Sequence, residues 1–198
     1  GHVVRNNFIH HVGVQVTYGA AVYIHQAHSI VVSHNVMSKS PRNLISVFGV
    51  LFMYEAYGQG PYASAVYPRV PPHAYGENIT FFSQYDINTA SNITFYRNDI
   101  SKGCSNSNDC GVFEAWGPGR DNVIAENVFH DVWGSMACGM SIIFPDAGND
   151  FLTVRGNVLH DNVASGIGGK SPGGSSGMGI IQLKGYTQSF TDNIVADR

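Results

Sequence analysis

Two aspartates, Asp109 and Asp146, are the residues of this sequence best placed to do chemistry. Asp109 precedes a strand-like segment and Asp146 follows the corresponding segment one repeat later, so they could flank a substrate. A pair of carboxyl groups, one protonated and one ionised, can supply the acid and the base or nucleophile that break a glycosidic bond. Either aspartate could instead brace a turn, because Asp side chains commonly bind turn backbone.

A third carboxylate, Glu114, lies inside a strand-like segment between Phe113 and Trp116. A charged side chain there either points toward a substrate or is buried with a partner such as Arg120. We expect Glu114 and Arg120 to orient the two aspartates. Trp116 is suited to stacking on a sugar ring. His25 interrupts an apolar strand and could face the same substrate.

Three other histidines, His10, His130 and His160, each stand three residues after an asparagine of a repeated unit. Because the repeat itself sets their position, we expect a stacked column of rings, with a metal site as the alternative. No Cys-x-x-Cys or Cys/His spacing typical of metal sites occurs, and we expect no metal or cofactor.

A repeated unit must position these residues. Three residues before each repeat asparagine and two residues after it, every side chain is apolar, whereas the residue just before it is never apolar. The intervals between the asparagines are close to 30 residues, or about twice that in one case. The asparagines are Asn7, Asn35, Asn98, Asn127, Asn157 and Asn193.

Short strands that alternate inward and outward side chains at this period predict a right-handed parallel β-helix of roughly six to seven coils, an all-β fold. We expect the asparagines to occupy left-handed bends and to form a hydrogen-bonded ladder. A second strand is expected after each bend, at residues 21–27, 44–50, 111–117, 139–144 and 178–184.

We treat residues 1–198 as a single β-helix domain, with excursions at 51–90, where proline is frequent, and at 166–179, where Gly and Ser are frequent. The chain begins and ends inside a repeat, which predicts that it is a segment of a longer protein. Uncapped ends or neighbouring coils would permit self-association.

Composition excludes several classes of function. The formal net charge is −3 and the basic residues are scattered, so we expect no nucleic-acid partner. Apolar runs fall short of a membrane span, so we expect no membrane contact. Cys104 and Cys110 flank a polar loop, and the sequence fits either a disulfide between them or two reduced thiols.

The segments 106–111 and 113–122 resemble the Asp-Gly-Gly…Glu-x-Trp-Gly-x-Gly-Arg-Asp-Asn signature of secreted carbohydrate-active β-helix proteins, closest to glycoside hydrolase family 141, which includes fucosidase and xylanase activities. Other matching pieces are Ser40-Pro41-Arg42, Pro145-Asp146 and Leu183-Lys184-Gly185. The resemblance implies catalytic carboxylates at Asp109 and Asp146 and a sugar-binding Lys184. The chain departs from the signature at Cys110 and Val112.

The sequence therefore predicts a secreted glycoside hydrolase acting on a plant or microbial polysaccharide or oligosaccharide. Asp109 and Asp146 would be catalytic, with Glu114 grouped beside them, and His25, Trp116, Arg120 and Lys184 would hold the substrate. The alternative is a non-catalytic β-helix module that binds carbohydrate, adheres or forms fibres. A polysaccharide lyase is disfavoured because the chain shows no acid cluster for Ca²⁺.

Overall fold

The computed structural model describes residues 1–49, 90–107, 110–132, 140–146, 149, 151–162, 181 and 187–196. Within these ranges every regular element is a β-strand, so the all-β prediction is confirmed for the part of the chain that the structure describes. The strands form three parallel sheets, here called A, B and C.

Among the described residues, sheets A and B have six strands each, and sheet C has four. Sheet A contains β1 (His2–Arg5), β4 (Ile30–Ser33), β7 (Ile93–Tyr96), β10 (Asn122–Ala125), β13 (Leu152–Arg155) and β15 (Ser189–Thr191). Sheet B contains β2 (Phe8–His10), β5 (Val36–Ser38), β8 (Asp99–Ser101), β11 (Val128–His130), β14 (Val158–His160) and β16 (Ile194–Ala196). Sheet C contains β3 (Val22–His25), β6 (Ile45–Phe48), β9 (Cys110–Trp116) and β12 (Met140–Pro145).

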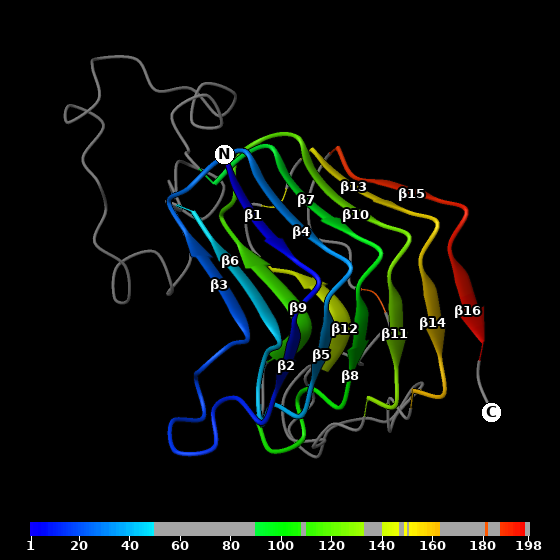
Figure 1. Cartoon of the computed structure of the whole chain (residues 1–198). Coiled ribbons are helices and arrows are strands. Elements are labelled where there is room, and N and C mark those ends of the chain that lie inside the picture. The colour runs from blue at the N-terminus through cyan, green and yellow to red at the C-terminus, as the bar shows by residue number, and fades with distance from the viewer. Residues whose placement is uncertain are drawn as a thin grey trace, which may run out of the picture.

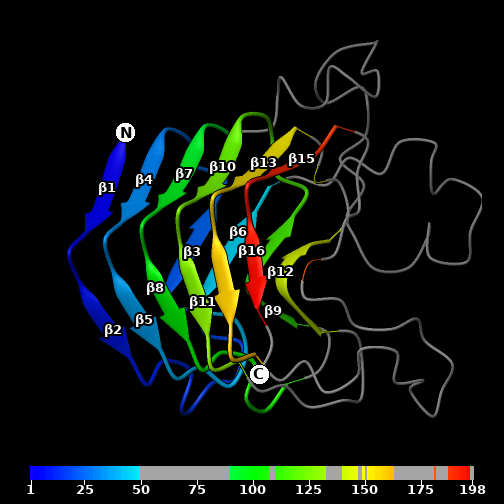
Figure 2. The same ribbon diagram turned by 90° about the vertical axis from the view of Figure 1, so that its right-hand side faces the viewer.

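From β1 to β14, successive strands visit the sheets in the order A, B, C and then return to A one strand further along the stack, and β15 and β16 add the last strands of sheets A and B. Each strand of sheet A bends directly into a strand of sheet B, and the first strands, β1 and β2, lie at the opposite end of the stack from the last, β15 and β16 (Figures 1 and 2). Equivalent residues of neighbouring units therefore lie next to each other in rows that cross the strands.

The core lies between the three sheets and is built from the apolar rows that the repeat predicted. Val32, Phe95, Ile124 and Val154 from sheet A meet Met37, Ile100, Phe129 and Leu159 from sheet B, all almost completely buried. The inward row of sheet C contains Ile45, Phe113 and Ile143, which the strand register aligns. Phe113 packs edge-on against Phe95 with ring centroids 5.0 Å apart, so the third sheet is tied to the first.

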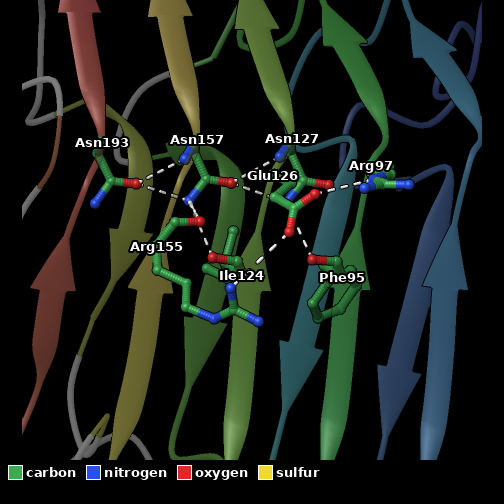
Figure 3. Close-up of polar contacts among 8 residues, drawn as sticks. All are labelled: Phe95, Arg97, Ile124, Glu126, Asn127, Arg155, Asn157 and Asn193. Atoms are coloured by element: carbon green, nitrogen blue, oxygen red, sulfur yellow. Dashed lines mark hydrogen bonds and ion pairs between the residues drawn. The ribbon is translucent and has the colours of Figure 1, made fainter.

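The predicted asparagine ladder is present at the bend between sheets A and B. Each asparagine donates from its backbone N and its Nδ2 to Oδ1 of the next one, for example Asn127 to Asn157 at 2.9 and 3.0 Å (Figure 3). The Nδ2 of Asn127 also donates to the backbone oxygen of Phe95 at 3.1 Å. Asn35, Asn98, Asn127 and Asn157 are at most 1% exposed, so the ladder satisfies backbone groups that have no access to water.

The expectation that the ladder asparagines adopt the left-handed conformation was wrong. That conformation falls on the residue just before each of them, with φ between 52° and 62°: Asn6, His34, Arg97, Glu126, Gly156 and Asp192. That residue points away from the core and makes the turn, which leaves the asparagine side chain free to point inward. At each bend one residue therefore turns the chain, and the asparagine after it makes the hydrogen bonds of the ladder.

The strands of sheet C lie within one or two residues of the second strands expected at 21–27, 44–50, 111–117 and 139–144. Of the segment expected at 178–184 only Ile181 is described, and it makes a parallel bridge with Ile143. The excursions expected at 51–90 and 166–179 lie outside the described residues, except Ala90, which is buried.

We expect Asn127→Ala to lower the free energy of unfolding by about 3 kcal/mol, because it leaves several buried backbone and amide groups without hydrogen-bond partners. Urea denaturation followed by circular dichroism would measure the change. The matched variant is Asn7→Ala, at the exposed end of the same ladder, which should cost about 1 kcal/mol or less. Equal losses in the two variants would contradict a ladder stabilised by burial.

Candidate functional site

The outer face of sheet C carries the candidate site. In β3 the residues Val22 and Ile24 are buried, whereas Tyr23 and His25 are exposed and point away from the core. The register carries this alternation across the sheet, because Tyr23 pairs with Ser46, and Ser46 pairs with Glu114. Two outward rows therefore cross the sheet.

One row consists of ring side chains. His25 pairs with Phe48, and Phe48 pairs with Trp116, from three adjacent strands. The Phe48 and Trp116 ring centroids are 6.1 Å apart and the rings meet edge to face. Tyr23 joins them from the neighbouring row, 5.5 Å from Phe48, and is 59% exposed. These four rings, His25, Phe48, Trp116 and Tyr23, are called the aromatic row below.

Asp146 lies at the end of the aromatic row. It directly follows Pro145, which pairs with Ala115, so the register places Asp146 beside Trp116. Its backbone N donates to Ala115 O at 2.9 Å, and Asn149 Nδ2 donates to the Asp146 carbonyl oxygen at 3.0 Å. The backbone at the end of β12 is thus held by hydrogen bonds, and the residue itself is half-buried.

Glu114 belongs to the second row and is only 6% exposed. Its Oε1 lies 3.7 Å from Nη2 of Arg42, with both side chains nearly buried. Its Oε2 accepts a hydrogen bond from Asn43 Nδ2, which also donates to Ser46 Oγ at 2.9 Å. The carboxylate is therefore neutralised and hydrogen-bonded, as a buried charge requires.

Arg42 is held on two further sides. Its guanidinium carbon stands 4.5 Å from the centre of the Tyr18 ring, a cation–π contact, and its Nη1 donates to Ser107 Oγ at 3.1 Å. Arg42 thus connects Glu114 with two loop segments. We call Tyr18, Arg42, Asn43, Ser107 and Glu114 the Arg42 cluster.

Arg120, expected as a partner of Glu114, stands over the ring of Phe151 at 4.6 Å. Its carbonyl oxygen accepts from Asn92 N at 2.9 Å, next to β7. Asp109 and Lys184 lie outside the described residues. The structure therefore brings His25, Trp116 and Asp146 onto one face, with Glu114 beneath the neighbouring surface.

The histidine column forms in part. His130 and His160 stack with ring centroids 5.3 Å apart and an interplanar angle of 4°, whereas His10 pairs with Ser38. His130 hydrogen-bonds Asp99 at 2.8 Å and Asp131 at 3.0 Å. Burial disfavours its charged form, but these two carboxylates outweigh burial and raise the pKa of His130. Both ring nitrogens are engaged by carboxylates, which suits a protonated imidazole rather than a metal ligand.

Among the described residues no group of three or more His, Cys, Asp or Glu side chains is arranged to hold a metal ion. The same part of the chain contains no helix that could cross a membrane.

Sequence reasoning missed three residues that the structure brings into this region, Tyr23, Phe48 and Asn43, and it also missed the pairing of Arg42 with Glu114. The sequence did contain a signal for Tyr23 and Phe48, since each occupies an outward position that alternates with core residues in its strand, as His25 does. The partnership of Arg42 with Glu114 had no such signal, because it joins residues far apart in the chain.

Comparisons of the chain with protein-family models, with curated proteins and with solved structures found no match. The resemblance to glycoside hydrolase family 141 therefore rests on the quoted residues alone.

We expect Arg42→Met to lower the free energy of unfolding by about 3 kcal/mol, because it leaves the Glu114 carboxylate buried without its counter-charge. Urea denaturation would measure the loss. The double variant Arg42→Met, Glu114→Gln should recover much of it, since the uncompensated charge is then removed.

The matched control is Arg97→Met, which removes a guanidinium from an exposed ion pair with Glu126 and should cost less than about 1 kcal/mol. If Arg42→Met were as mild as Arg97→Met, the Arg42 cluster would not stabilise the buried carboxylate.

Proposed function

We propose that the three sheets are the faces of a right-handed parallel β-helix and that the outer face of sheet C binds a polysaccharide. The observation that carries the binding proposal is the aromatic row, in which rings from adjacent strands stand side by side, with Tyr23 and His25 exposed and Phe48 and Trp116 half-buried.

The chemistry of the aromatic row suits a sugar. Aromatic rings offer broad apolar faces to the C–H groups of a pyranose, while His25 and Asp146 at its two ends offer hydrogen-bonding groups to hydroxyls. Adjacent strands are about 4.8 Å apart, a step comparable with one sugar residue of an extended glycan. A glycan lying across the strands would thus meet one side chain of the row for each sugar.

We expect Trp116→Ala to weaken polysaccharide binding by roughly tenfold, the effect of losing about 1.4 kcal/mol of stacking. Affinity electrophoresis in gels containing individual plant and microbial polysaccharides would identify a bound polymer, and calorimetry with its oligosaccharides would measure the change. Phe8→Ala is the control, because Phe8 is a 69% exposed ring on another sheet. Equal weakening by both substitutions, or no retardation of the unsubstituted chain by any polymer, would count against the proposal.

A second candidate function, hydrolysis of the bound glycan, is favoured by the position of Asp146 beside Trp116. In this proposal Asp146 and Asp109 are the two carboxylates of a glycoside hydrolase. Glu114 acts as a positioning residue, because its carboxylate is buried and paired with Arg42. With a polysaccharide as substrate, we propose that the protein is secreted.

We expect Asp146→Asn to reduce hydrolysis of the bound polysaccharide at least 100-fold, the contribution typical of a general acid or base, while binding changes little. Reducing-sugar release would measure the rate and affinity electrophoresis the binding. Asp192→Asn, at an exposed bend on the opposite side of the unit, should leave both unchanged. Full hydrolysis by the Asp146 variant would exclude this candidate without affecting the binding proposal.

A further inference from the structure

Two buried cysteines flank the segment between β8 and β9. Cys104 follows β8 and Cys110 opens β9, and both are completely buried. Both are free thiols in this structure. Both lie beside residues 42–44 of the previous unit, because Cys104 N donates to Arg42 O at 2.7 Å and Val112 O, two residues after Cys110, accepts from Leu44 N at 2.9 Å. Cys110 Sγ donates to the Ser107 carbonyl oxygen at 3.5 Å. Two buried side chains that can form a covalent bond with one another therefore lie six residues apart in the chain and beside the same segment of the previous unit.

The segment that begins at Cys104 supports the Arg42 cluster. Cys104 N donates to Arg42 O at 2.7 Å, and Asn106 N donates to Pro41 O at 3.0 Å. Ser107 Oγ accepts the hydrogen bond from Arg42 Nη1. Residues 104–107 thus run beside residues 40–42 of the previous unit and contact both the backbone and the guanidinium of Arg42.

The environment of the Cys104 thiol keeps it unreactive after folding. Burial raises the pKa of Cys104 well above its usual value, and the neighbouring Cys110 and Glu114 raise it further, against the opposing effect of Arg42. The thiolate is the form that attacks disulfides. The reaction between these cysteines must therefore take place while the segment is still exposed, before the outer face closes over them.

We propose that Cys104 and Cys110 form an intramolecular disulfide when the chain folds under oxidising conditions, and that this bond holds residues 104–107 against Arg42. The oxidant is a small disulfide such as oxidised glutathione. One cysteine attacks it as the thiolate and forms a mixed disulfide, releasing one glutathione thiol. The second cysteine then displaces the other glutathione, so two protons and two electrons leave the cysteines and two glutathione thiols are formed.

The test is to unfold and reduce the chain, refold it in a mixture of oxidised and reduced glutathione, and then alkylate free thiols under denaturing conditions. The chain has three cysteines, so we expect a single alkylated site, Cys138, and a peptide pair joined through Cys104 and Cys110. Three alkylated cysteines, or a bridge that includes Cys138, would overturn the proposal. If little refolded protein is recovered, the chain can instead be produced by secretion into an oxidising compartment and alkylated in the same way.

Stability gives a second readout. Closing so short a loop should raise the Tm of the oxidised chain by roughly 5 °C over the reduced chain. Cys138→Ser should keep this difference and Cys104→Ser should abolish it. No difference in the unsubstituted chain would contradict the stabilising role. The disulfide is independent of the proposed polysaccharide binding, since both readouts are made without a sugar.

Discussion

The asparagine ladder is the interaction on which the rest of the structure depends. Each ladder asparagine uses its backbone N, its Nδ2 and its Oδ1 to join its neighbour, as Asn98 joins Asn127 through two bonds of 2.9 Å. Two bonds to one acceptor set both the spacing and the register of adjacent units. Because a shift by one residue would turn every core side chain outward, this register decides which side chains line the core and which form the outer rows.

The aromatic row and the Arg42 cluster follow from that register in different ways. The row is a direct product of it, since Phe48 and Trp116 become neighbours once their strands pair. The cluster needs more, because its members come from loop segments as well as from strands. A buried carboxylate at Glu114 is tolerated only with a counter-charge and hydrogen-bond donors close by, and Arg42 and Asn43 supply them.

The two parts of this face are suited to different tasks. The aromatic row is open to solvent at Tyr23 and His25 and can contact a ligand, whereas Arg42 and Glu114 are nearly buried and hold loop segments in position. The proposed Cys104–Cys110 bond belongs to the second task. It would hold Ser107 and Arg42 in position next to the aromatic row. A covalent bond formed during folding would thus stabilise a surface of the folded protein.

The sequence by itself determined the repeat, the all-β architecture, the core rows and the ladder, because these depend on side-chain alternation and on a residue type recurring at one spacing. It also indicated His25, Trp116 and Asp146, through local pattern and resemblance. The left-handed position was misassigned, since the period locates a bend and not which of its two residues makes the turn. Only the tertiary structure decided that Glu114 pairs with Arg42 and that Tyr23 and Phe48 complete the aromatic row. Arg42 and Glu114 follow repeat asparagines that are 63 residues apart instead of about 30, so their distance along the chain carries no information about their distance in space.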